Sequence, residues 1–342
     1  MTPSPPTATP AAKSSELRIV SLLPSATEMV CALGLGEHLV GITHCCDFPQ
    51  EALSKPRIVH SALDWDRLSL GEIDATVSNT LKQGKSLYIV NEHQLRELAP
   101  TLIVTQDLCQ VCAPSGNEVS RVLRNLPSPP QVLWMSPHSV DEIHGNLREL
   151  GNATGRIERA KSLIAAGTAR LAEVARRLAP ATHRPRVFCA EWVDPLYCSG
   201  HWVPEQVQLA AGDDVLGRRW ANSVRVTWDE LIKSQPEKIF VLSCGFDRER
   251  NHEQAKWFLQ QPGSNSLLAV KNDQVFALDA AYFSRPGPRV IEGVELLAHL
   301  MSKTINAIIN DAIITMIALS CNSFHDGHDT FVMSSVGGLA SH

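Results

Sequence analysis

Short apolar runs alternate with segments of helical periodicity along most of this chain. The runs RIVSLL (18–23), TLIVTQ (101–106) and KIFVLSC (238–244) are rich in β-branched residues, as buried strands are. Segments with apolar residues three and four positions apart follow most of these runs. Parallel strands need a crossover connection, which is usually a helix. This order therefore predicts an α/β fold with mostly parallel sheets.

One segment, residues 155–178, contains no proline and one internal glycine, Gly167. Its apolar residues recur on one helix face: Ile157, Ala160, Ile164, Leu171, Val174 and Leu178. A helix of this length measures roughly 36 Å, the width of a small domain. We therefore expect two α/β lobes with central, mostly parallel sheets, joined by one long α-helix.

The length of 342 residues suits two domains of ordinary size. The first sixteen residues are rich in proline, serine, threonine and alanine, so we expect them to be disordered. The expected division of the chain is a disordered segment 1–16, an N-terminal lobe 17–152, a connecting helix 153–181, a C-terminal lobe 182–303 and a tail 304–342 without an assigned role.

The charge and the cysteine content bear on which class of partner the protein binds and in which cellular compartment it works. The net charge is −5, with 31 basic and 36 acidic residues and no basic block, so nucleic acid is not an expected partner. No run of about 18 apolar residues predicts a spanning helix. Residues 1–16 lack the apolar core of a secretory signal, and the nine cysteines suit a reducing compartment. We therefore expect a soluble, cytoplasmic protein.

Polar residues follow the strands of the first lobe, where ligands gather in open α/β sheets. SLLPSATE (21–28) either presents helix-terminal amides to a ligand or forms a capping box between Ser25 and Glu28. In THCCDFP (43–49) and in the Cys109–Cys112 C-x-x-C, the thiols either line a pocket or take part in metal or redox chemistry. The candidate metal ligands are His44, Cys46, Cys109 and Cys112.

Two motifs of the second lobe also carry chemistry. AEWVDPLYCSGHWVPE (190–205) concentrates aromatic side chains, which form either a surface for a planar ligand or a small core. His201 within it is a candidate axial ligand for a chelated metal. In YFSRPGPR (282–289), Arg285 and Arg289 either hold polar groups of a ligand or start the last helix with acidic partners.

Six blocks in order resemble the cobalamin-type and iron-chelate-type substrate-binding proteins of transport systems, and more narrowly a cobalamin-binding branch that often lacks an export signal. The blocks are SLLPSATE, THCCDFP, LAPTLIVTQDLCQVCA, GHWVPE, SCGFD and SRPGPRVIEGVELLA. The resemblance implies two lobes on one joining helix, with the ligand between them and little domain closure. It assigns the cleft to Pro24, Ser25, Thr27, His44, Asp47, Gln106, Cys109, Glu191, Trp192, Trp202, Phe246, Tyr282 and Arg285.

The expected function is non-enzymatic binding of a metal chelate, with cobalamin or another corrinoid as the first choice and no catalytic cofactor. Nucleophile-elbow, P-loop and zinc-protease motifs are absent from the sequence, which disfavours an enzyme. The alternative is a thiol redox or zinc or iron protein that uses the C-x-x-C with His44 and Cys46. We expect a monomer. A permease partner is known for exported relatives, but no residue of this chain indicates one.

Overall fold

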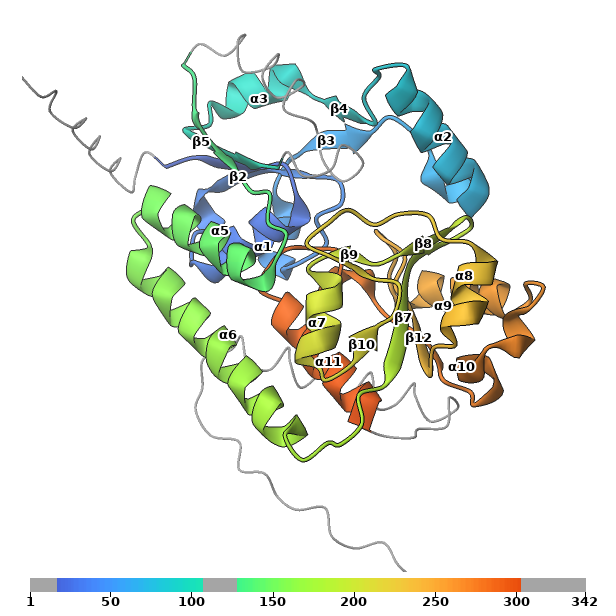
Figure 1. The fold of residues 1–342 in the computed structure, drawn as a ribbon. Coiled ribbons are helices and arrows are strands. Elements are labelled where there is room, and N and C mark those ends of the chain that lie inside the picture. The colour runs from blue at the N-terminus through green and yellow to red at the C-terminus, as the bar shows by residue number, and fades with distance from the viewer. Residues whose placement is uncertain (1–16, 107–127, 303–342) are drawn as a thin grey trace, which may run out of the picture. The chain divides into compact units, whose positions relative to one another are not determined.

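The structure is a computed structural model that describes residues 17–106 and 128–302. Two mostly parallel sheets dominate these residues, one before and one after a long helix, α6 (Ile157–Leu178) (Figure 1). We call the described residues before α6 the first half and those after it the second half. The predicted fold class, α/β with mostly parallel sheets, is confirmed.

The first sheet has six described strands in the order β4-β3-β2-β1-β5-β6, and only the β3–β4 pair is antiparallel among them. Its strands are β1 (Ile19–Ser21), β2 (Leu39–Thr43), β3 (Arg57–Ser61), β4 (Tyr88–Val90), β5 (Leu102–Thr105) and β6 (Gln131–Trp134). The first-half helices are α1 (Pro24–Ala32), α2 (Leu70–Lys82), α3 (Glu92–Leu98) and α5 (Val140–Ala153). A helix predicted near 115–125 lies outside the described residues.

The capping box predicted between Ser25 and Glu28 is wrong. Helix α1 begins at Pro24, which needs no amide partner there, and the N-cap Leu23 makes no side-chain cap. Ser25 therefore lies inside the first turn. The Glu28 carboxylate instead binds Arg289, 261 positions along the chain.

The sequence analysis missed α2, which has a genuine capping box. Ser69 Oγ accepts the Glu72 amide, and the Glu72 carboxylate accepts the Ser69 amide at 2.8 Å. Its apolar residues Leu70, Ile73, Val77 and Leu81 follow the three-and-four spacing of a helix, so the sequence does carry the periodic signal of α2.

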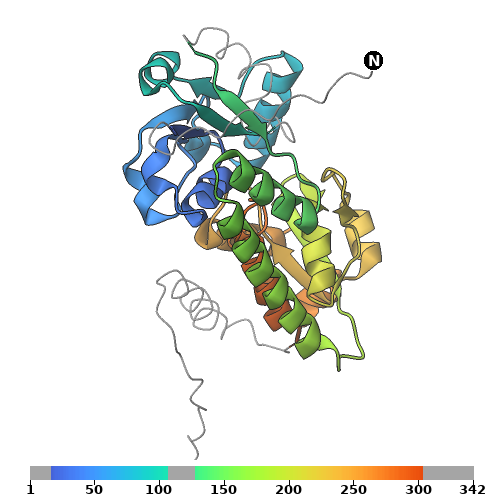
Figure 2. The same ribbon diagram turned by 90° about the vertical axis from the view of Figure 1, so that its left-hand side faces the viewer.

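Helix α6 lies where the sequence predicts a long helix, two residues shorter at its start. Gly155 has φ of +71°, which ends the preceding turn before α6 begins. The helix packs against α5 and against the last described helix, α11 (Val290–Ser302) (Figure 2). Arg170 of α6 reinforces that contact through a bidentate pair with Glu295 at 2.6 and 2.9 Å. The lobe boundaries at 152–153 and 181–182 remain predictions.

The second sheet has the order β10-β7-β12-β13, with β8 antiparallel to β7, and β9 and β11 form a separate parallel pair. The strands are β7 (Arg186–Val193), β8 (Leu196–Cys198), β9 (Gly200–His201), β10 (Asp213–Asp214), β11 (Arg218–Arg219), β12 (Lys238–Val241) and β13 (Val275–Ala277). The helices before α11 are α7 (Val203–Leu209), α8 (Trp228–Ser234), α9 (Arg248–Leu259) and α10 (Leu268–Lys271).

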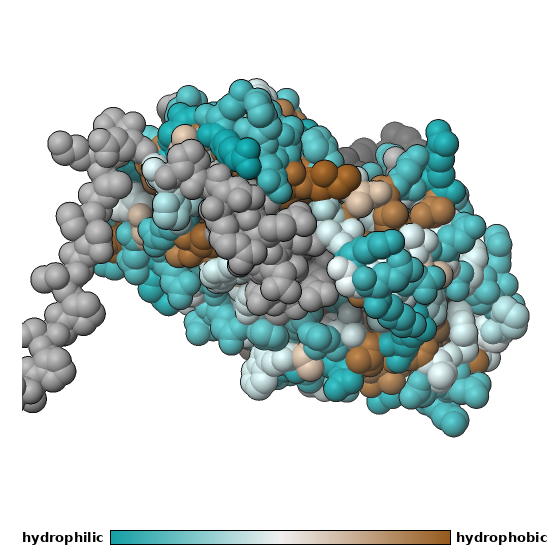
Figure 3. Space-filling view, turned by 90° about the horizontal axis from the view of Figure 1, so that it is seen from above, coloured by the Kyte–Doolittle hydropathy of each residue, from teal (hydrophilic) through white to brown (hydrophobic). Residues whose placement is uncertain are grey.

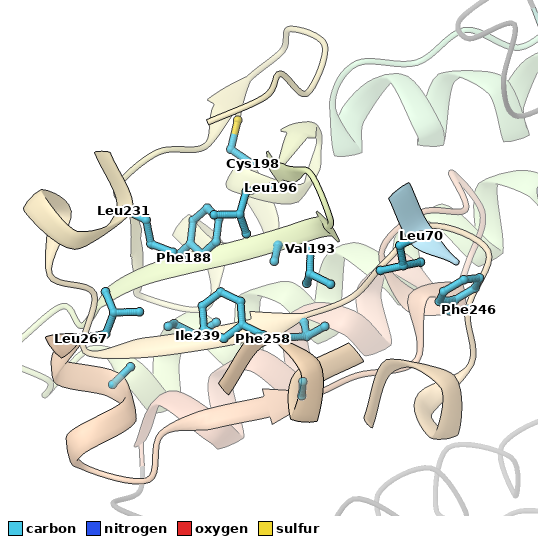
Figure 4. Close-up of a cluster of buried hydrophobic side chains, with 14 of the residues drawn as sticks. Leu70, Phe188, Val193, Leu196, Cys198, Leu231, Ile239, Phe246, Phe258 and Leu267 are labelled. Atoms are coloured by element: carbon cyan, nitrogen blue, oxygen red, sulfur yellow. The ribbon is translucent and has the colours of Figure 1, made fainter. Parts of the chain in front are cut away.

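Each sheet has its own buried cluster. The first contains Val20, Ile58 and Ile103. The second is built on Phe188, Ile239 and Phe258, and it also takes in Leu70 and Ile73 of α2 (Figure 4). Hydrophilic residues cover most of the face in Figure 3, where apolar ones form small separate groups. No helix among the described residues is long and apolar enough to cross a membrane.

Candidate functional site

Two arginines of the second half reach carboxylates of the first half. Arg285 makes a bidentate pair with Asp47, which follows β2, at 2.5 and 2.7 Å. Arg289, at the start of α11, makes a bidentate pair with Glu28 of α1 at 2.5 and 3.0 Å. Arg285 also lies 3.5 Å from Glu28. Of the two roles predicted for these arginines, the structure favours acidic protein partners.

The two ion pairs differ in their access to water. The Glu28 and Arg289 side chains are 2% and 13% exposed, whereas Asp47 is 63% exposed. Burial alone would raise the pKa of Asp47, but the hydrogen bonds and charge of Arg285 outweigh it, and the net pKa lies below its ordinary value. A buried pair with both partners satisfied resists separation, because either charge would be left unpaired in a poorly solvated place. Glu28–Arg289 is therefore the firmer of the two links.

His44, Cys45 and Cys46, which follow β2, contact residues of the first half. His44 Nδ1 lies 3.2 Å from the Val59 carbonyl, and its Nε2 lies 3.2 Å from Cys45 Sγ. Burial lowers the pKa of His44 and raises that of Cys45 to about 11. Cys46 is buried 3.1 Å from Thr27 Oγ1, and burial raises its pKa too. These thiols therefore stay protonated near neutral pH, which disfavours a thiolate nucleophile.

The metal alternative has no support in the part of the chain that the structure describes. Within residues 17–106 and 128–302, no three histidine, cysteine or acidic side chains are grouped to hold a metal ion. Cys109 and Cys112, two of the four candidate ligands, lie outside the described residues.

The aromatic residues of segment 190–205, which the sequence assigns either to a ligand surface or to a small core, lie in two places. Trp192 pairs with Phe246, with ring centroids 5.4 Å apart. Trp202 is 4% exposed and donates its indole N–H to the Phe283 carbonyl at 2.6 Å, so it packs inside the second half. The Tyr197 hydroxyl reaches Asp74 of α2 at 3.2 Å. Trp192 and Tyr197 are cross-strand partners on β7 and β8, so their side chains share one face of the sheet, whereas Trp202 is buried elsewhere in the second half.

The other predicted residues have these places. Pro24 starts α1, Ser25 and Thr27 are buried within it, and Gln106, 5% exposed, follows β5. The Tyr282 ring lies 5.4 Å from the Arg289 guanidinium. These five stay predicted ligand residues, and Cys109 lies outside the described range.

Glu191, another predicted ligand residue, is held within the second half. Its carboxylate accepts the Gly200 amide at 2.9 Å. Burial outweighs this hydrogen bond and raises the pKa of Glu191 to about 8, so the group is largely neutral at pH 7.

A cavity that the sequence analysis missed lies between the halves. It has a volume of 530 Å³ and is lined by His138, Ser139, Asp141, Glu142, Glu205 and Trp220. The Val140 amide at the start of α5 donates to Glu205 of α7 at 3.0 Å, which links the two walls. The signal for it was available, because His138 and Ser139 follow β6 at the sheet edge where ligands gather.

The known proteins to which this chain is similar are substrate-binding proteins. The family model described as periplasmic binding protein matches residues 19–282. A vitamin B12-binding protein of Vibrio cholerae is 25% identical over 281 residues, which cover 81% of this chain and 86% of the relative. An uncharacterized ABC transporter substrate-binding lipoprotein of Bacillus subtilis is 24% identical over 291 residues, or 84% of this chain and 80% of the relative.

Solved structures share the fold. The periplasmic vitamin B12 binding protein of Vibrio cholerae has a TM-score of 0.62 at 24% identity, covering 84% of this chain and 97% of that one. A periplasmic heme-binding protein of Roseiflexus has a TM-score of 0.65 at 20% identity, covering 84% and 98%.

These relatives correct one expectation and establish the family. The cytoplasmic location inferred from residues 1–16 and from the cysteines is wrong, because the relatives are described as periplasmic proteins or as a lipoprotein. The sequence argument failed because it used the missing apolar segment and the thiol count as if they reported location. The family match spans more than half of the chain, and the chain belongs to the periplasmic binding protein family.

Proposed function

We propose that this protein binds a metal chelate between its two halves, without catalysing a reaction, and that the ligand is cobalamin or another corrinoid. The observation that carries the proposal is the meeting of the two sheets' strand ends, where Asp47 and Arg285 link the halves. Relatives named for vitamin B12 and heme support the ligand class, and the vitamin B12-binding relatives favour a corrinoid within it.

The chemistry of the residues between the halves suits such a ligand. Trp192 and Phe246 offer flat aromatic area, and the 530 Å³ cavity offers the carboxylates of Asp141, Glu142 and Glu205. A corrinoid carries primary amides around its ring, which donate hydrogen bonds to such acceptors.

The first experiment is calorimetric and spectroscopic titration of the purified, reduced chain with hydroxocobalamin, with hemin titrated in parallel. We expect saturable one-to-one binding of hydroxocobalamin. Trp192→Ala should weaken it by roughly 1–3 kcal/mol, the scale of a central aromatic contact. The control is Leu259→Ala, an exposed apolar residue at the end of α9, which should bind as the wild type does.

The two titrations distinguish the identity of the chelate from chelate binding itself. Tighter binding of hemin would replace the corrinoid with a different chelate. Failure of both ligands to bind would contradict the proposed function.

We propose an ABC-type permease as the protein partner, supported by the transporter assignment in the name of the Bacillus subtilis relative. We also propose that the free protein is a monomer. Light scattering during size-exclusion chromatography would contradict the monomer if the mass were at least twice the 37.5 kDa of one chain.

A further inference from the structure

Helix α2 belongs to the first half by chain order but packs with the second half. It lies between β3 and β4 of the first sheet. Its two buried residues, Leu70 and Ile73, belong to the cluster of the second half, together with Val193 and Phe246 (Figure 4). Among the residues that the structure describes, the cluster of Val20, Ile58 and Ile103 in the first sheet contains no residue of α2.

The other apolar residues of α2 and of the segment before it also pack against the second half. Val77, one turn further along α2, packs against the second-half cluster, as do Trp65 and Leu68 just before the helix. Residues three and four apart share one helix face, so Leu70, Ile73 and Val77 form a single stripe. That stripe is turned to the second half.

Three polar residues, Asp74, Tyr197 and Arg225, join the same helix to the second half, and we call them the latch. The Asp74 carboxylate pairs with Arg225 at 2.5 Å and accepts the Tyr197 hydroxyl at 3.2 Å. Arg225 also donates to the Tyr197 oxygen at 3.0 Å. At the start of the helix, a Cβ added to Gly71 would lie 3.2 Å from Asp194 Oδ2, so the Asp194 side chain lies against α2 there.

Helix α2 packs beside Trp192 and Phe246, the aromatic pair of the candidate site. Trp192 is near the end of β7 and Phe246 follows β12, at the sheet edge where ligands of α/β proteins gather. Phe246 is only 7% exposed, and Leu70 lies beside it (Figure 4). A planar ligand that contacts Phe246 needs space that α2 now occupies.

We propose that α2 is a gate, which must leave the second half before a chelate reaches the Trp192–Phe246 pair. This inference rests on the proposed function. It deepens that function by making access to the site depend on a first-half helix.

The construction of α2 suits a movable element. Only Leu70 and Ile73 are buried in it, and the latch residue Arg225 is 54% exposed, so water can solvate it on release. The capping box of Ser69 and Glu72 is internal to the segment, so it adds no contact with the second half that opening would have to break. Local opening of a helix is the kind of lid motion that controls ligand exchange in other binding sites.

The test locks the gate with a disulfide. In the Gly71→Cys/Asp194→Cys variant, oxidation with a low-molecular-weight disulfide should join α2 to the β7–β8 turn, which mass spectrometry confirms. Stopped-flow mixing with hydroxocobalamin should then show association at least about tenfold slower than in the reduced variant, because the open population is removed. Reduction should restore the wild-type rate. The single variants Gly71→Cys and Asp194→Cys, treated alike, control for the native thiols.

Opening of the gate is also tested by loosening the latch. Asp74→Asn should speed association severalfold, because it removes the charge that holds Arg225. The matched control is Glu253→Gln, which removes an exposed ion pair with Lys256 on α9 and should leave the rate unchanged.

Ligand-free hydrogen exchange supplies a measurement that does not depend on the chelate. Amides of α2 should exchange through a local opening well below the free energy of global unfolding. Exchange of α2 only by global unfolding would overturn the gate, and so would unchanged association in the locked variant. Absence of hydroxocobalamin and hemin binding to the wild type would instead overturn the proposed function and leave the exchange result to decide the gate.

Discussion

At the residue scale, the two arginine–carboxylate links predict different effects on stability. Glu28 is 2% exposed and holds Arg289, which is 13% exposed, whereas Asp47 is 63% exposed. Glu28→Gln leaves Arg289 with a weakened partner where water is scarce, so we expect a loss of roughly 3 kcal/mol in the free energy of unfolding. Asp47→Asn should cost about 1 kcal/mol or less, because solvent screens this pair. Urea unfolding measures both, and equal losses would contradict the ranking.

At the element scale, helix caps separate two serines that look alike in sequence. Ser69 caps α2 through the Glu72 amide, while Ser25 lies inside the first turn of α1 and cannot cap it. Ser69→Ala should lower the free energy of unfolding by about 1 kcal/mol, or increase hydrogen exchange in α2 if the helix opens locally. Ser25→Ala should have the smaller effect on its own helix. A larger effect at Ser25 than at Ser69 would mean that the caps are assigned wrongly.

At the scale of the whole molecule, buried carboxyls predict a stability that falls as pH rises. Burial raises the pKa of Glu191 to about 8 and of Glu292 to about 7, above ordinary values of 4.5. The folded state then holds more protons than the unfolded state, so this contribution is complete below pH 4.5 and is lost as pH rises through 7 and 8. Histidines whose pKa is lowered by folding, such as His44, change the free energy of unfolding only below about pH 6.5, the pKa of a histidine in the unfolded chain. Urea unfolding between pH 6.5 and 8.5 should therefore show declining stability, with a shallower decline in Glu191→Gln. An identical slope in both proteins would exclude Glu191 as a source.

Local patterns in the sequence predicted most strands of both sheets, though not β4, β8 or β10, and the long helix α6, because apolar runs and helical periodicity lie within a few neighbouring residues. The placement of polar residues after strands also directed attention to Asp47 and Arg285, which pair with each other across the halves. The partners of Glu28 and Asp74 lie 261 and 151 positions away, and no local pattern encodes such a distance. Trp202 likewise suits either a ligand surface or a small core in the sequence, and only the structure shows its indole N–H donating to the Phe283 carbonyl. Only the tertiary structure decided which side chains face the junction of the halves, because burial and pairing depend on how the elements pack together.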